Sequence, residues 1–178
     1  LNIFKLIFPE FVKIERLKKF KLLKNFVKIS NELYLSILLV DNKKNHEYFS
    51  HKYRVSGKTS ETLSILGDNY INCINDKDFF KKKLKLNLYN IGAENLKTVF
   101  CLYLLDKKNL SKKDIAFFKI IDGISIPKFP YDGQYLIKKG VKEGKAIGKI
   151  LKAAKQGWIE NDFSLSQLEL DNMIKNTK

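Results

Sequence analysis

The sequence predicts an all-α protein in which a multi-helix body is followed by a small helical tail. Apolar residues recur at spacings of three and four along most of the chain, which places them on one face of a helix. Two-residue alternation of apolar and polar residues, the pattern of half-buried strands, is not sustained anywhere. Hydrophobic residues make up 44% of the 178 residues and charged residues 30%, a balance typical of a packed globular protein.

The body is expected to contain a series of amphipathic helices. Their predicted ranges are 9–26, 30–40, 45–53, 56–75, 78–88, 93–105 and 112–122. Two helix starts have a further basis, since Ser111 stands three residues before Asp114 and Ser166 three residues before Glu169. At this spacing the hydroxyl accepts a backbone amide of the first turn and the acid accepts the amide of the serine, which forms a capping box.

The clearest domain boundary lies at Pro127 and Pro130. Each proline ring removes an amide donor and biases the preceding residue toward extended geometry, so the segment 126–132 cannot remain helical. We therefore expect a helical body over residues 1–126. A helical tail is expected over residues 127–178, with a glycine-rich turn and a basic helix.

The chain is strongly basic, with a formal net charge of +15. Such a field attracts polyanions, either nucleic acid or an anionic membrane. All 34 basic residues except Arg16 and Arg54 are lysines. Lysine enrichment beside many Asn and Ile residues is also what A/T-rich codon usage produces, so charge alone does not identify the partner.

Cysteine usage and hydropathy indicate a cytoplasmic protein without a membrane partner. Cys73 and Cys101 lie in apolar stretches without CxxC spacing or a nearby histidine, which is typical of reduced core residues. The longest apolar runs, 33–40 and 99–105, are far shorter than the roughly 20 residues of a membrane helix. No signal-peptide pattern is visible at the start.

Glycines interrupt helix-forming sequence in the tail. Gly140 can end a short helix in the left-handed conformation, and Gly144 lets the next helix begin with little bulk around its free amides. Unsatisfied amides and the helix dipole favour an anion at such a position, so a phosphate could bind there.

The helix expected from Lys142 onward has two contrasting faces. At about 100° per residue, Gln156 shares one face with four lysines, which we call the basic arc: Lys142, Lys145, Lys149 and Lys152. The opposite face carries the apolar residues Ile147, Ile150, Leu151, Ala154 and Trp158, which we expect in the core. The alternative to a binding surface is a solvated lysine face in a lysine-rich protein.

Three motifs follow one another in the tail. They are FPYDG at residues 129–133, the glycines at 140, 144 and 148, and WIENDF at residues 158–163. In this order and spacing, the tail resembles the C-terminal signature of the bacterial CCA-adding tRNA nucleotidyltransferase / poly(A) polymerase family. That signature has the form F-P-x-x-G-x-D-L, then G-x-x-x-G-x-x-x-G, then W-I-x-x-x-F. Tyr135 stands where the pattern has Asp, which is a departure from the signature.

Weaker segments of the body follow the order that the same family would give them. They are FPE at 8–10, YLSILL at 34–39, YRVS at 53–56 and LYNIG at 88–92. The resemblance therefore spans nearly the whole chain. It implies a helical body and tail that hold the backbone of the upper half of tRNA, while the 3′ end of the tRNA enters a separate catalytic head.

The resemblance implies tRNA as the partner and an RNA-binding set in the tail. The expected set is Lys138, Lys139, Gly140, Lys142, Gly144, Lys145, Lys149 and Lys152. The family's two-metal nucleotidyl transfer needs a Gly-Ser loop and an Asp-x-Asp pair on a sheet. We identify neither in that context, so no catalytic or metal-binding residue is assigned. Mg²⁺ and CTP or ATP are expected only in the head, and none of them in this chain.

Several local matches to other chemistry have simpler interpretations. The Asp-x-Asp at 76–78 has no strand around it and is expected to begin a helix, where acids complement the dipole. GKT at 57–59 lacks the first glycine of a phosphate loop and is expected to begin a helix as well. His46 and His51 are five residues apart, which does not place both on one helical face for a metal, so we expect them at the surface or at helix ends.

Two alternatives to a tRNA-binding part of this family stay open, a DNA-binding module and an inactive gene remnant. A helix, Gly140-Val141, Gly144 and a second helix resemble a stand-alone helix-hairpin-helix DNA-binding module, with two extra residues between the glycines. The chain begins with Leu1 where methionine is usual, so we expect a fragment, an unusual start codon or an inactive gene remnant. If the gene is split, a separately encoded catalytic head is a further expected partner.

Overall fold

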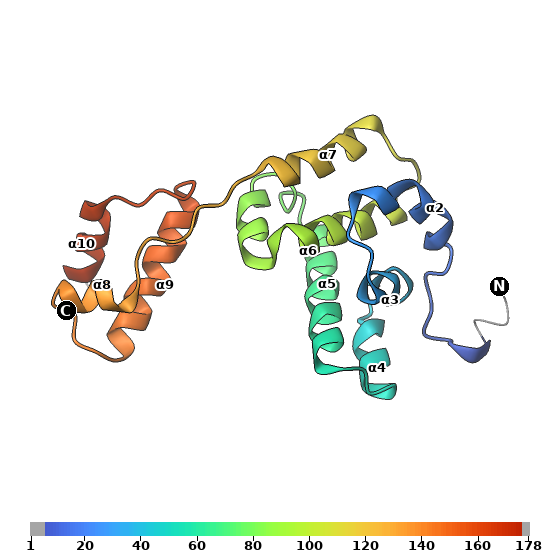
Figure 1. Ribbon diagram of the computed structural model, residues 1–178, viewed down its shortest axis with the longest axis horizontal. Helices are drawn as coiled ribbons and strands as arrows, with labels where there is room; N and C mark the ends of the chain where they lie inside the picture. The colour runs from blue at the N-terminus through green and yellow to red at the C-terminus, as the bar shows by residue number, and fades with distance from the viewer. Residues whose placement is uncertain (1–5, 176–178) are drawn as a thin grey trace. The chain divides into compact units, whose positions relative to one another are not determined.

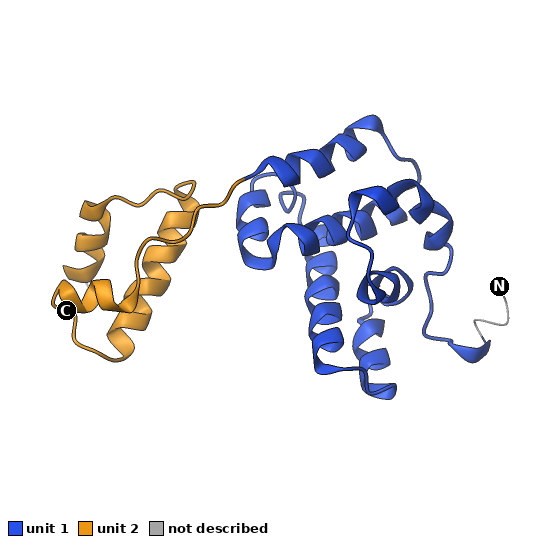
Figure 2. Cartoon of the chain, in the orientation of Figure 1, with its two compact units in different colours: residues 1–124 blue, residues 125–178 orange. Residues whose placement is uncertain are grey.

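The computed structural model describes residues 6–175, and its regular elements in that range are all helical, which confirms the all-α prediction (Figure 1). The chain divides into two compact units, residues 1–124 and residues 125–178 (Figure 2). The boundary predicted from the prolines, between residues 126 and 127, lies two residues farther along the chain than this one.

Unit 1 contains the helices of the body. They are α2 (Arg16–Leu23), the 3₁₀ helix η1 (Lys24–Phe26), α3 (Asn31–Leu39), α4 (Asn45–Lys52), α5 (Gly57–Asn75), α6 (Leu84–Asp106) and α7 (Lys112–Gly123). The two longest, α5 and α6, pack against each other, and the others pack on this pair or on one another. Leu63 and Leu66 of α5 and Leu96 and Val99 of α6 are almost fully buried, as their three-residue spacing predicts.

A buried arginine links the start of α2 to the end of α6. The side chain of Arg16 in α2 has no exposed surface, and its Nε donates to Oδ1 of Asp106 at 2.9 Å. The guanidinium also donates to the backbone carbonyls of Ile37 and Val40, while the Tyr70 hydroxyl donates to Asp106. Because the guanidinium and the carboxylate both have hydrogen-bond partners, the charge can be buried without a large loss of hydration energy.

Two predicted helix starts are wrong, and long-range contacts explain the first. Helix α2 begins at Arg16 and not at Pro9. Glu10 is buried and binds Lys52 and Tyr53, and the amide of Lys13 donates to the carbonyl of Leu38 at 3.2 Å. The Lys13 amide is therefore paired with α3 and not with its own segment, and the side-chain bonds of Glu10 hold the segment against the end of α4.

The second wrong start is at Asp78, because α6 begins at Leu84. Asp76 ends α5, and its carboxylate accepts from the Asp78 amide and from Lys83 Nζ, both at 2.8 Å. Residues 76–78 therefore open a turn and do not begin a helix. The predicted break between 88 and 93 appears inside α6 as Gly92, whose φ of 77° departs from the helix.

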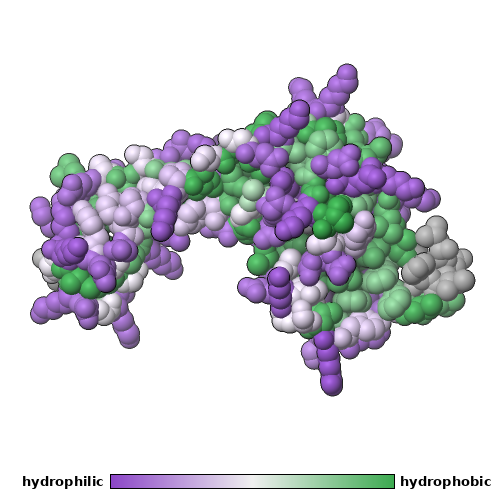
Figure 3. Space-filling model, in the orientation of Figure 1, coloured by the Kyte–Doolittle hydropathy of each residue, from purple (hydrophilic) through white to green (hydrophobic). Residues whose placement is uncertain are grey.

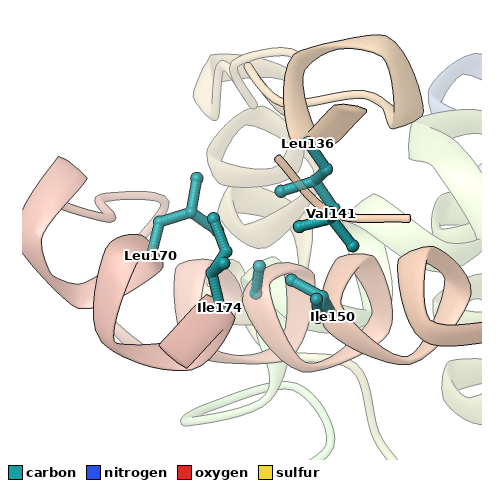
Figure 4. Packing of buried hydrophobic residues seen from close by; sticks show 6 residues of the cluster. Leu136, Val141, Ile150, Leu170 and Ile174 are labelled. Carbon is teal, nitrogen blue, oxygen red and sulfur yellow. The ribbon is translucent and has the colours of Figure 1, made fainter. Parts of the chain in front are cut away.

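Unit 2 contains α8 (Gly133–Lys138), α9 (Lys145–Glu160) and α10 (Gln167–Lys175). One apolar cluster joins all three helices (Figure 4). Its buried members are Leu136, Val141, Ile150, Ala154, Leu170 and Ile174. Capping boxes start α7 at Ser111 and α10 at Ser166, as predicted.

Candidate nucleic-acid interface

The turn after α8 is a Schellman motif centred on Gly140. The amide of Gly140 donates to the carbonyl of Ile137 at 2.9 Å, and that of Val141 donates to Leu136 at 3.1 Å. This pair of bonds requires the left-handed conformation, and Gly140 has a φ of 83°. Leu136 and Val141 also meet in the apolar cluster (Figure 4), so the turn is fixed by packing as well as by hydrogen bonds.

Residues 139–144 form a hairpin that joins α8 to α9, and its second glycine, Gly144, immediately precedes α9. Gly144 is the N-cap, with a φ of 127° and no side chain that caps the helix. A Cβ at Gly140 or Gly144 would meet nothing within 4 Å, so the positive φ and not crowding accounts for the glycines. The uncapped amides and the helix dipole make this end electropositive.

Helix α9 separates an apolar face from a basic one, as predicted. Ile150, Ala154 and Trp158 are buried, whereas Lys145, Lys149 and Lys152 are exposed. Lys142 is exposed too, but it precedes the first residue of α9, so its predicted place on the helix is wrong. Within residues 6–175, the four lysines of the basic arc form no ion pair.

Lys138 and Lys139 have different surroundings although they are neighbours. Lys138 is exposed at the end of α8, while Lys139 Nζ lies 3.1 Å from the carboxylate of Asp171 in α10. The hydrogen bond to Asp171 raises the pKa of Lys139, which therefore remains charged. Its ammonium also lies 5.9 Å from the ring of Tyr135.

The WIENDF motif ends α9 around a buried tryptophan. Trp158 is 2% exposed, and its ring lies 4.8 Å from Phe163 and 5.2 Å from Phe129 in edge-on contacts. Asp162 and Phe163 have φ values of 56° and 63°, which turn the chain back so that the Phe163 amide donates to the Trp158 carbonyl at 2.7 Å. The motif thus has a structural role, and no local sequence signal predicted its left-handed pair.

The two histidines of the body differ from each other. Both lie in the end turns of α4, which confirms the predicted helix-end position, but His51 is exposed whereas His46 is only 1% exposed. The ring of His46 fits against Gly67 of α5, where no side chain takes the space. In the described range, no cluster of three or more His, Cys, Asp or Glu residues could hold a metal ion.

Lysines are not confined to α9, and hydrophilic side chains cover much of the visible face of both units (Figure 3). The distinguishing feature of α9 is therefore geometric. It combines an uncapped N-terminus, unpaired lysines that follow it at helical spacing, and an opposite face fixed in a core.

Comparison of the chain with models of known protein families, with curated proteins and with solved structures finds no match. Among the helices of residues 6–175, none combines the length and the apolar character that crossing a membrane requires.

Proposed function

We propose that this chain binds the sugar-phosphate backbone of tRNA and holds it for 3′-end nucleotide addition by a catalytic head outside these 178 residues. The observation that carries the proposal is the exposed, unpaired basic arc next to the uncapped N-terminus of α9. The family resemblance of the tail motifs supplies the choice of tRNA and of the reaction.

The chemistry of the basic arc suits phosphates and not bases. Lysine is a compact point charge with three donors, and it neutralises phosphates without reading a sequence. From Lys145 to Lys152 the helix rises about 10 Å, so several ammonium groups can reach neighbouring phosphates of one strand. Each phosphate that a lysine neutralises releases condensed counterions, which makes the affinity depend on salt.

The rigid support of the basic arc strengthens this proposal. Ile150 and Ala154 fix α9 in the unit 2 core, and the Lys139–Asp171 ion pair connects the hairpin to α10. A surface that is ordered before binding loses less conformational entropy when the partner arrives.

The test is the salt dependence of tRNA binding. Replacing Lys142, Lys145, Lys149 and Lys152 by Gln should flatten the slope of log affinity against log salt by about 0.7–0.9 for each phosphate that is no longer neutralised. The matched control replaces by Gln four exposed lysines of unit 1 that form no ion pair with the described residues, and it removes the same charge. Its positions are Lys18, Lys21, Lys24 and Lys28. An equal decrease of affinity in both variants would reduce the basic arc to a solvated lysine face.

A second candidate is a helix-hairpin-helix module for duplex DNA. The observation in its favour is the hairpin that joins α8 to α9. It contains Gly140 in the left-handed conformation, and its Gly144 leaves the N-terminus of α9 without a capping side chain. Structured tRNA and duplex DNA of equal length, compared at physiological salt, separate the two functions. A clear preference for tRNA supports the first candidate, and equal affinity supports the second.

The role in nucleotide addition needs its own assay. The chain is incubated with tRNA lacking its 3′ end, CTP, ATP and Mg²⁺, with and without a separately expressed head of the family. Incorporation is expected only with the head, and the basic-arc variant should raise the tRNA concentration needed. Incorporation by the pure chain would contradict this division of labour, and an absence of tRNA binding would favour an inactive remnant.

A further inference from the structure

Unit 1 contains a cavity of about 440 Å³ near the end of α5. The turn between α5 and α6 forms one side, and residues of α6 and α7 form the others. Its volume lies in the range of small-molecule sites, which is about 300–1,000 Å³. All of its lining residues belong to unit 1, so the site is complete within one unit.

The wall of the cavity is aromatic. Phe80 of the turn meets Phe100 of α6 edge-on at 5.0 Å, and Phe100 lies 4.7 Å from Phe117 of α7. Phe100 is buried, whereas Phe80, Phe117 and Tyr103 are only partly buried, so they retain surface for a ligand. Because the rings hold one another in place, a flat aromatic ligand would meet a preformed surface.

The rim of the cavity carries excess positive charge. Two carboxylates line it, but Asp76 binds Lys83 and Asp114 binds Lys107, at 2.8 and 2.9 Å. The remaining oxygens of these carboxylates accept from backbone or serine groups. Within the described range, the rim lysines 77, 81 and 113 form no ion pair and are exposed.

We propose that this cavity binds a nucleotide, with the base against Phe80, Tyr103 and Phe117 and the phosphate at the rim lysines. A nucleotide combines a flat aromatic base with an anionic phosphate. The aromatic wall of the cavity suits the base, and the basic rim suits the phosphate. Stacking of bases on aromatic side chains together with a basic groove is the usual means of binding unpaired nucleotides without sequence preference. The nucleotide can be free or can belong to an unpaired stretch of RNA. The proposal goes beyond the tRNA-backbone function and does not depend on α9.

The first experiment measures binding of AMP, adenosine and ribose 5-phosphate to the full chain by calorimetry. The chain carries the Gln substitutions of the basic arc, so α9 does not contribute. AMP should bind saturably, and each of the two partial ligands should bind at least about fivefold more weakly. Ribose 5-phosphate binding as tightly as AMP would overturn the role of the aromatic wall.

The second experiment tests the residues. Replacing Lys77, Lys81 and Lys113 by Gln should weaken AMP at least about fivefold, while the same change at Lys18, Lys21 and Lys24 should not. Phe117→Leu should weaken AMP roughly 5- to 100-fold, the range of one stacked base. Since that variant could unfold, its thermal transition is measured, and the lysine variant decides the outcome if the transition is absent. AMP binding that survives the rim substitutions unchanged, or no binding at all, would overturn the proposal.

A single-stranded oligoadenylate, tested on the chain with the Gln substitutions of the basic arc, distinguishes a free nucleotide from one in a strand. If the oligonucleotide binds at least about tenfold more tightly than AMP and competes with it, the site takes an unpaired nucleotide of a strand. If AMP binds as well as the oligonucleotide, the site takes a free nucleotide.

Discussion

The imidazole of His46 occupies the space that a side chain on Gly67 would need. A Cβ built at Gly67 would lie 2.1 Å from Cε1 of His46, far inside van der Waals contact. The two residues join α4 to the middle of α5, and both are buried. Close approach of the helices therefore depends on a residue without a side chain at position 67.

Gly67→Ala should destabilise unit 1 by about 1–3 kcal/mol, the usual cost of overpacking. In an unconstrained helix the same change would stabilise by roughly 0.5–1 kcal/mol, so the sign of the change in the free energy of unfolding shows whether His46 crowds position 67. The control is Gly57→Ala at the start of the same helix, where a Cβ would meet nothing within 4 Å. Chemical denaturation measures both. A stabilised Gly67→Ala variant would show that His46 is free to move aside.

His46 also predicts a decrease of stability in mild acid. Burial lowers the pKa of His46 below 6.5, although Glu47, Asp68 and Asp41 act in the opposite direction. Within residues 6–175, neither ring nitrogen has a hydrogen-bond partner, and both are buried. Below about pH 6.5 the unfolded chain binds a proton that the folded chain does not, so the free energy of unfolding falls until the folded pKa is reached.

The measurement compares the wild type with His46→Leu from about pH 8 to about pH 5. The wild type should become less stable relative to His46→Leu as the pH falls below about 6.5, by at most about 1.4 kcal/mol per pH unit. His51→Gln serves as the control because His51 is exposed. Parallel pH curves for all three proteins would contradict the prediction.

Asp106→Asn should destabilise unit 1 by about 2–3 kcal/mol, because it leaves the buried guanidinium of Arg16 without its carboxylate. Burial acts to raise the pKa of Asp106, but hydrogen bonds from Arg16 and Tyr70 outweigh it and lower the pKa below 3.8. This stabilisation is present above about pH 3.8 and disappears as the pH falls through the folded pKa. The control Asp122→Asn removes a more exposed partner of Lys97 and should cost less than about 1 kcal/mol. Equal losses of stability in the two variants would mean that the burial of Arg16 does not increase the cost of removing its carboxylate partner.

Local signals account for the parts of the fold that could be predicted. The hydroxyls of Ser111 and Ser166 accept amides of the first turns of α7 and α10, within three residues of each serine. The apolar periodicity likewise identified the buried face of α9. These features depend on residues close together in the sequence, so one sequence is enough to find them.

The features that were wrongly predicted, or not predicted, from the sequence have long-range causes. Glu10 binds two residues far along the chain, Lys52 and Tyr53, and keeps its segment out of α2. His46 is buried only because α5 offers a glycine opposite it. The aromatic cavity joins α5, α6 and α7, and no local motif marks it. Such features depend on which helices pack together, which periodicity does not specify.

Gly148 connects stability with the proposed function. It is exposed in α9 next to Lys149, and a Cβ there would meet nothing within 4 Å. Gly148→Ala should therefore stabilise unit 2 by roughly 0.5–1 kcal/mol. The larger Gly148→Leu should keep the fold but weaken tRNA binding, since its side chain borders the basic arc. Unchanged tRNA affinity in Gly148→Leu would show that the RNA does not approach α9 closely.

Trp158→Ala should remove most of the stability of unit 2. The side chain is 2% exposed and has edge-on contacts with Phe129 and Phe163, so truncation should cost about 3–5 kcal/mol. A unit of this size has little stability in reserve. Amide hydrogen exchange should therefore show reduced protection in α8, α9 and α10, while unit 1 keeps its own core.

Trp158→Phe is the control for this change, since it keeps an aromatic ring between Phe129 and Phe163 and should retain most of the protection. Binding of tRNA should fall with Trp158→Ala only to the extent that unit 2 unfolds, because the indole lies on the face of α9 opposite Lys145, Lys149 and Lys152. If exchange protection were unchanged while tRNA affinity collapsed, Trp158 would act as a stacking surface for RNA, and the assignment of the two faces of α9 would be reversed.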